Sequence, residues 1–140
     1  MKTNNCHGDN AAVIRKMNIE IKRNDKLAIY LQIYKQIKEQ ILNGRLKSGD
    51  KILSYREITK RFDVSIITVT KAYELLSDEK LITSSQKGCF VSENASAIAI
   101  DYNMQRIEDN LNDAIISAKV VDIGLDELHV LINELWNDEK

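Results

Sequence analysis

The chain of 140 residues contains no proline, two cysteines and two histidines. Without proline, every predicted turn depends on Gly, Asn, Asp and Ser. Cys6 and Cys89 lie far apart and form no C-x-x-C motif, which excludes a disulfide framework and a zinc site. The pair Cys6-His7 is interpreted as part of an ill-ordered terminus rather than as a metal site. The sequence therefore predicts no metal and no other cofactor.

Long apolar runs are also missing. No run approaches the roughly 20 apolar residues that a membrane-spanning helix needs. The first residues lack the apolar core of a secretion signal, so we expect no membrane association and a cytoplasmic location. A glycine-rich phosphate loop and a nucleophile with a histidine partner are absent as well, so an enzyme is not predicted.

The net charge of −1 conceals an uneven distribution of charge along the chain. Residues 26–92 contain twelve Lys or Arg and seven Asp or Glu, a balance of +5. Residues 93–140 contain three and eleven, a balance of −8. A basic segment joined to an acidic one favours a part that binds a polyanion and a part that stays away from it. Ordinary variation between helix surfaces would explain the same counts.

Residues 1–24 show no sustained periodicity and are predicted to form an N-terminal extension. Met17 could be a native start, with residues 1–16 either an upstream extension or an ill-ordered tail, and the sequence leaves this open. The alternation of Ile19 and Ile21 is typical of a short strand or an extended segment.

Two local signals define the first two predicted helices. Apolar residues repeated every four positions predict a helix over Ala28–Leu42, ended by Asn43-Gly44. Ser54 and Glu57 form the S-x-x-E pattern of a capping box, in which each side chain bonds the backbone N–H of the other residue. This pattern predicts a helix that occupies Tyr55–Phe62.

A turn, a third helix and a hairpin follow. Asp63-Val64-Ser65 interrupts the helical pattern, and the next helix is predicted over Ile66–Asp78. Lys80–Thr83 and Cys89–Ser92 are strand-like and are joined by a polar loop. This order is that of a winged helix-turn-helix, which places one helix in the major groove of DNA. The predicted fold is mainly α with a small β wing, and this domain occupies residues 25–93.

Residues 94–140 are predicted to form a C-terminal domain of two amphipathic helices, which serves for dimerisation. The helices are expected over Ala97–Ala118 and Asp126–Asn137, with Asp126 capping the second. Their apolar stripes exceed what two short helices can bury on each other, which favours pairing with a second chain. The alternative is that the same residues complete an intrachain hairpin. The candidate interface residues are Ile107, Leu111, Ile115, Leu128, Leu131, Leu135 and Trp136.

Several segments in register resemble the amino-terminal domain of GntR-type bacterial repressors. They are Leu27–Lys38, Gly44–Ile58, Val64-Ser65, Thr68–Tyr73 and Gly88–Val91. The short tail, with its Glu-Leu-Trp near the end, resembles the YtrA subfamily. The resemblance implies a transcriptional regulator, a repressor by default, that binds a palindromic operator in double-stranded DNA as a homodimer. It suggests transporter operons as targets, whereas the sequence identifies no small-molecule effector.

The resemblance also implies which helix residues contact DNA. Arg56, in the R-E-[LI] motif, is expected to meet guanine or phosphate, the alternative being a surface Arg paired with a carboxylate. On the third helix, hydroxyl groups near its start could cap it or bond phosphate. Tyr73 is either a core residue or a phosphate ligand. The contacts implied on this helix are Ser65, Ile66, Ile67, Thr68, Thr70, Lys71 and Tyr73.

The loop of the predicted wing carries a basic residue before a glycine, as the family pattern does. Gly88 would allow a close backbone approach, and Lys87 would reach a minor groove or a phosphate. A plain hairpin loop is the alternative.

Ile66 and Ile67 depart from the family pattern, because relatives often carry Pro, Arg or Asn there. Two exposed isoleucines would suit contact with thymine methyl groups and an A·T-rich operator. The alternative is that one of them packs inward and the other is tolerated. A winged-helix protein-interaction module without sequence-specific DNA binding would also suit such a pair, and it is the alternative function.

Overall fold

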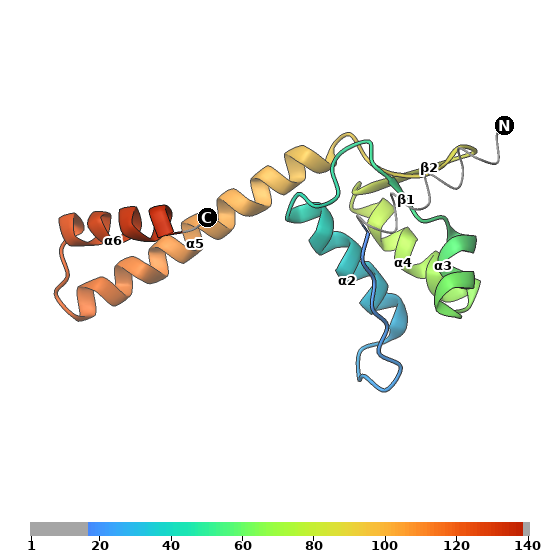
Figure 1. Ribbon diagram of the computed structural model, residues 1–140, viewed down its shortest axis with the longest axis horizontal. Helices are drawn as coiled ribbons and strands as arrows, with labels where there is room; N and C mark the ends of the chain where they lie inside the picture. The colour runs from blue at the N-terminus through green and yellow to red at the C-terminus, as the bar shows by residue number, and fades with distance from the viewer. Residues whose placement is uncertain (1–16, 139–140) are drawn as a thin grey trace. The chain divides into compact units, whose positions relative to one another are not determined.

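The computed structural model of the protein describes residues 17–138, which form two compact units with their boundary between Tyr102 and Asn103. We refer to residues 17–102 as the first unit and to residues 103–138 as the tail unit. The first unit contains the helices α2, α3 and α4 and a small sheet (Figure 1). The prediction on residues 1–16, including Cys6-His7, lies outside the described residues.

Helix α2 (Ile29–Leu42) forms because its apolar residues recur on one face. Ile33, Ile37 and Ile41 on that face are at most 2% exposed and lie in the centre of the core. The helix ends at Asn43, and Gly44 adopts a φ of +82°, a conformation that glycine reaches without steric cost. The predicted helix is confirmed, with its start one residue later.

Helices α3 (Tyr55–Phe62) and α4 (Ile66–Asp78) have the bounds that the sequence predicts. The capping box is present: Glu57 N–H donates to Ser54 Oγ at 3.2 Å, and Ser54 N–H donates to Glu57 Oε1 at 2.9 Å. Asp63 ends α3 in the left-handed conformation, at a φ of 51°. The chain can therefore turn sharply before α4 begins.

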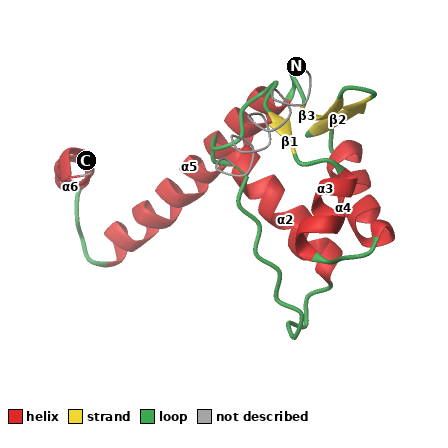
Figure 2. Cartoon of the chain, turned by 45° about the vertical axis from the view of Figure 1, so that its right-hand side comes forward, coloured by secondary structure: helices red, strands yellow, loops and turns green. Residues whose placement is uncertain are grey.

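A three-stranded antiparallel sheet completes the wing, in the order β1-β3-β2 (Figure 2). Its strands are β1 (Lys51–Ile52), β2 (Ile82–Ser85) and β3 (Gly88–Val91). The sequence predicts the two long strands, but β2 begins two residues later because Lys80 takes a left-handed φ of 62° in the turn after α4. β1 is too short for a periodicity signal, and it is paired only through contacts with distant β3.

The segment 17–22 belongs to the first unit, so the predicted boundary between an N-terminal extension and the domain at residues 24/25 is wrong for this segment. Met17 and Ile19 are buried in the core. No strand holds the segment. Instead, the backbone N–H and C=O of residues 18, 20 and 22 bond the side-chain amides of Gln40, Gln36 and Gln32 at 2.6–2.9 Å. Every second residue of the extended segment is thus hydrogen-bonded to every fourth residue of α2.

The tail unit consists of the larger part of α5 (Ala95–Val120) and all of α6 (Leu125–Asp138). Both helices are longer than predicted, and Asp126 lies in the first turn of α6 rather than at its cap. The beginning of α5 belongs to the first unit because Ala95 is buried there and Ile98 packs against the core. The division therefore falls later than the predicted boundary at 93/94. None of the described helices is long and apolar enough to cross a membrane.

Candidate nucleic-acid interface

Helix α4 presents an outward face that begins with two apolar side chains. Ile66 and Ile67 are 47% and 70% exposed, so neither packs inward and that alternative is wrong. Thr70 and Lys71 follow one turn later on the same face, with Lys71 exposed and Thr70 half-buried. The opposite face, which includes Val69, is buried. The face that Ile66 begins is therefore accessible to a ligand along its length.

The hydroxyl groups at the start of α4 bond each other and the helix backbone. Ser65 Oγ accepts a hydrogen bond from Thr68 N–H at 3.1 Å, and the two hydroxyl oxygens are 2.8 Å apart. Ser65 thus caps α4, as one of the predicted roles requires. An exposed hydroxyl in such a pair can still accept or donate one further bond, to a phosphate for example.

Tyr73 does not lie on the exposed face of α4, so its predicted phosphate contact is wrong. Its side chain is 0% exposed, and its hydroxyl donates to the carbonyl oxygen of Leu53. Its ring meets that of Tyr55 edge to face, with centroids 4.9 Å apart and an interplanar angle of 80°. Burial raises the pKa of Tyr73 well above its ordinary value. Tyr73 therefore joins α4 to the segment before α3 from inside the core.

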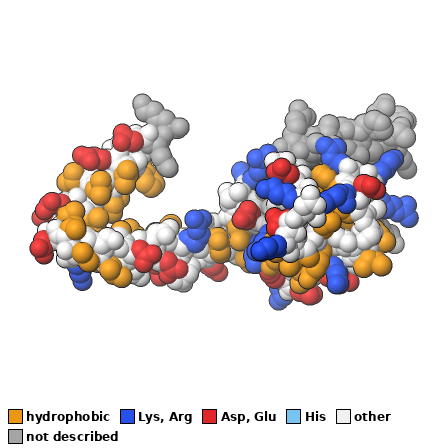
Figure 3. Space-filling model, turned by 90° about the horizontal axis from the view of Figure 1, so that it is seen from below, with side chains coloured by type: hydrophobic (Ala, Val, Ile, Leu, Met, Phe, Trp, Pro, Cys, Tyr) orange, Lys and Arg blue, Asp and Glu red, His pale blue; other side chains and the backbone are white. Residues whose placement is uncertain are grey.

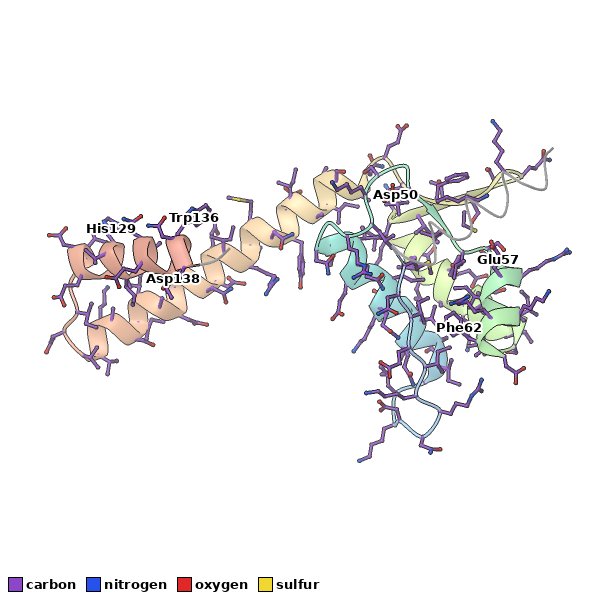
Figure 4. All side chains as sticks on the ribbon, viewed as in Figure 1. Asp50, Glu57, Phe62, His129, Trp136 and Asp138 are labelled. Atoms are coloured by element: carbon purple, nitrogen blue, oxygen red, sulfur yellow. The ribbon has the colours of Figure 1, made fainter. Side chains whose placement is uncertain are left out.

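Arg56 occupies the second position of α3 and is exposed. Among the described residues no hydrogen bond or ion pair engages its guanidinium, which distinguishes it from the paired surface Arg considered as the alternative. Figure 4 labels Glu57 in the first part of α3 and Phe62 at the end of this helix. The Glu57 side chain is occupied by the capping box and faces the backbone of Ser54.

The wing depends on the backbone freedom of glycine at its tip. Gly88 adopts a φ of +128°, and a Cβ built there would lie 3.2 Å from Lys51 Cε. Gly88 pairs with Ser85 across the hairpin, so Gln86 and Lys87 form its loop. The Lys87 side chain is exposed, while its backbone N–H donates to Ser85 Oγ at 3.2 Å. The loop therefore carries a cation at its tip, and Lys51 adds a second beside Gly88.

Arg23 is a residue of the interface region that sequence reasoning missed. Its Nη2 donates to the carbonyl oxygens of Phe62 and Asp63 at 2.7 and 2.8 Å, at the turn between α3 and α4. Carbonyl groups at a helix C-terminus have no partner within the helix, and Arg side chains satisfy them. No local sequence signal identifies this contact, because Arg23 and Phe62 are 39 residues apart in the chain.

A second set of contacts joins α2 to α4. Lys71 Nζ lies 5.0 Å from the centroid of the Tyr30 ring, in a cation–π arrangement. Near the end of α4, Lys38 Nζ pairs with Glu79 at 2.8 Å, and the Tyr34 hydroxyl also donates to that carboxylate. Burial alone would raise the pKa of Glu79, but the hydrogen bonds from Lys38 and Tyr34 outweigh it and lower this pKa. The hydrogen bond to Glu79 raises the pKa of Lys38.

The described residues contain no group of three or more His, Cys, Asp or Glu that could hold a metal ion. Cys89 is buried within β3, and burial raises the pKa of its thiol. A thiol with a raised pKa is a weak nucleophile at neutral pH. Cys89 is thus a packing residue of the wing.

The tail unit leaves its apolar side chains in contact with solvent. Helix α6 contains no buried residue in its described length, and Trp136 is 79% exposed. Figure 3 shows hydrophobic and acidic side chains gathered on the tail unit, and Lys and Arg side chains spread over the first unit. Of the predicted interface residues, Leu128 is half-buried and the others are exposed by 38% or more. These exposed residues are Ile107, Leu111, Ile115, Leu131, Leu135 and Trp136.

Residues 29–91 match the family described as bacterial regulatory proteins, gntR family. The chain is 37% identical over 123 residues to the HTH-type transcriptional repressor YtrA of Bacillus subtilis (strain 168), covering 87% of this chain and 95% of that protein. A solved structure of YtrA from Sulfolobus acidocaldarius, a GntR-family transcription factor, is 35% identical at a TM-score of 0.51, covering 65% of this chain and 97% of that one.

A GntR family transcriptional regulator from Listeria monocytogenes is 26% identical at a TM-score of 0.51, covering 79% of this chain and 97% of that one. The winged helix-turn-helix predicted from the sequence is confirmed by these similarities. The match to YtrA includes nearly the whole length of that repressor, so the short tail is shared as well as the winged domain. The chain therefore belongs to the gntR family of bacterial regulatory proteins, as a DNA-binding transcriptional regulator of the YtrA type.

Proposed function

We propose that the protein is a repressor that binds a palindromic operator as a homodimer, acts in the cytoplasm and has no catalytic activity of its own. The observation that carries the proposal is the exposed apolar surface of the tail unit. Leu111, Leu131 and Trp136 are exposed by 41%, 46% and 79%. Contiguous apolar surface of this kind marks an interaction site. A second copy offers the same surface, which gives a two-fold symmetric contact.

The DNA-facing side of each protomer is assigned to the first unit. The exposed cations Arg56, Lys71 and Lys87 come from α3, α4 and the wing, and they suit phosphate or base contacts. The tail unit belongs to the segment with a charge balance of −8, so it is repelled by the polyanion. The remaining DNA-contact residues in this proposal are Ser65, Ile66, Ile67, Thr68, Thr70 and Gly88.

Dimerisation has a functional consequence for operator binding. A single recognition helix makes few base contacts, and each bidentate base contact discriminates by only about 1–3 kcal/mol. In a dimer, binding of the second half-site is effectively intramolecular, which raises affinity without new contacts. A dimer with two-fold symmetry reads two half-sites on the same side of the duplex.

Selection of bound sequences from random DNA tests the operator part of this proposal. The expected result is an inverted repeat, bound with an affinity that falls steeply as salt rises. The one tryptophan of the chain, Trp136, reports on dimerisation. Dilution should shift its fluorescence towards the emission of a solvated indole as dimers dissociate. A solvated spectrum at every concentration, with a monomer in sedimentation, would contradict the homodimer.

A protein-interaction module is the second candidate function, favoured by the exposure of Ile66 and Ile67. Salt dependence separates the two functions. DNA binding releases counterions and weakens with salt, whereas an apolar protein contact does not weaken in this way. Failure to enrich any sequence from random DNA, with the protein folded, would favour the module.

A further inference from the structure

We propose that Ile66 and Ile67 determine operator specificity by contacting the 5-methyl groups of thymine bases in the major groove. The inference deepens the proposed function and rests on it. The 5-methyl group of thymine is the apolar group that base pairs present in that groove. An operator read in this way contains A·T pairs at the positions that face the start of α4.

The first observation is that these two residues are exceptional within residues 17–99 of the first unit, whereas Ile100 and Tyr102, which follow on α5, are exposed as well. Among the described residues 17–99, Ile66 and Ile67 are the large hydrophobic side chains that are exposed. Every other large apolar side chain of that range is buried or half-buried. Ile67 is 70% exposed although it lies in the first turn of a helix whose other face enters the core. The pair is therefore not explained by packing within the described part of the chain.

The second observation concerns the polar groups at the same helix end. Ser65 and Thr68 bond each other, and Ser65 also caps the helix backbone. Each hydroxyl group therefore has only part of its bonding capacity left for DNA. The two isoleucines also extend from the first turn of α4, and apolar contact is the readout that their side chains can make.

The third observation identifies DNA as the occupant of this surface. The apolar pair is small and is bordered on the same helix face by Thr70 and Lys71, one turn further on. The Lys71 ammonium group lies 5.0 Å from the centroid of the Tyr30 ring, so a contact with α2 limits its positions. Arg56 on α3, the neighbouring helix of the helix-turn-helix, is a further exposed cation of the first unit. An apolar pair with a cationic border complements a thymine methyl flanked by phosphates better than it complements a purely apolar protein surface.

The experiment begins with the operator selected on the full-length protein from random DNA. Each thymine of one half-site is then replaced by deoxyuridine, which removes the methyl group and keeps the base pairing. At the contacted positions, affinity should fall about fourfold per methyl, the factor expected when one methyl group leaves an apolar contact. The same replacement outside the half-site serves as the control for the DNA.

The matched protein variants are Ile67→Ala and Ile66→Ala, with Ile100→Ala as the control. Ile100 is an isoleucine of the first unit that is 63% exposed but lies on α5. The variants of α4 should bind more weakly and lose sensitivity to deoxyuridine at one position each. Ile100→Ala should retain that sensitivity. Circular dichroism and thermal unfolding check that each variant is folded.

The possible outcomes separate this inference from the proposed function. Wild-type binding that is indifferent to deoxyuridine at every half-site thymine would overturn the methyl contact while leaving the repressor proposal intact. Selected half-sites containing only G·C pairs would do the same. Absence of any enriched sequence would overturn both. Equal sensitivity to deoxyuridine in wild type and Ile67→Ala would exclude Ile67 as the contacting residue.

Discussion

The two units of the chain differ in how far their apolar side chains are buried. In the first unit, residues such as Ile33, Ile37 and Leu76 are completely buried around α2 and α4. In the tail unit, the apolar residues of two helices remain largely exposed, and the described length of α6 buries none of its residues. The first unit therefore contains its own core, whereas the apolar residues of the tail unit lack such a core in the described chain. The proposed homodimer would bury these residues against a second copy.

The largest effect is expected from a cavity in the core of the first unit. Ile37→Ala removes a side chain that is 0% exposed from the centre of α2. We expect the free energy of unfolding to fall by about 2–5 kcal/mol, as in other substitutions of this kind. Chemical denaturation followed by circular dichroism measures the change. An effect below about 0.5 kcal/mol, typical of surface substitutions, would contradict the assignment of Ile37 to the core.

The corresponding change in the tail unit should affect association rather than folding of the first unit. Leu131→Glu places a charge among the exposed apolar residues of α6. The dimer should weaken by about 2 kcal/mol or more, the cost typical of a residue at the centre of an interface. Sedimentation equilibrium measures the shift, and Glu134→Gln on the same helix is the control. A Leu131→Glu protein that dimerises like wild type would exclude this face as the interface.

A smaller effect is expected at the turn between α3 and α4. Arg23→Ala removes the two hydrogen bonds to the carbonyl oxygens of Phe62 and Asp63. Because Arg23 is exposed, we expect a loss of about 1 kcal/mol in the free energy of unfolding. Operator affinity should fall as well, since the turn sets the position of α4, and Arg23→Lys should restore only part of it. Lys22→Ala, one residue away, is the control for charge.

The smallest effect concerns pH and the pair of Lys38 and Glu79. The pKa of Glu79 is lowered in the folded protein, so its stabilisation is present above the ordinary value of 4.5 and is lost as pH falls through the folded pKa. The pKa of Lys38 is raised, so its stabilisation is present below 10.5 and is lost as pH rises through the folded pKa. The side chains are about a third exposed, which limits the contribution to under about 1 kcal/mol.

Thermal unfolding at pH values from 3 to 7 measures the loss of stability as the pH falls. In Glu79→Gln this loss should be smaller by under about 1 kcal/mol. Glu39→Gln, an exposed carboxylate on α2, is the control. An unchanged pH dependence in Glu79→Gln would show that the contact between α2 and α4 does not depend on this pair.

Local sequence patterns predicted much of the first unit. The capping box of Ser54 and Glu57 is completed within four residues, and the helix bounds that it implies agree with α3. The cap at Ser65 and the periodicity after it likewise agree with α4. Strand β1 and the start of β2 were predicted less well. A two-residue strand has no periodicity of its own, and the left-handed turn at Lys80 has no glycine or asparagine to signal it.

The candidate interface was predicted only in part, because local sequence patterns indicate which residues are exposed but not how each side chain is oriented. Exposure of Arg56 and Lys87 follows from their positions on a short helix and a loop. The orientation of Tyr73 does not follow from its position on α4, because a ring near the core edge can point either way. Packing against Tyr55 and the bond to Leu53 decide it.

By itself, the sequence determined where α3 and α4 begin and end, the order of elements in the winged domain and the uneven distribution of charge, because these depend on residues close together in the chain. The tertiary structure alone decided that residues 17–22 bind the glutamines of α2 and that Arg23 reaches the turn after α3. It also decided that Tyr73 is buried while both Ile66 and Ile67 are exposed. Such features depend on groups brought together across long separations in the chain, and no local pattern encodes that proximity.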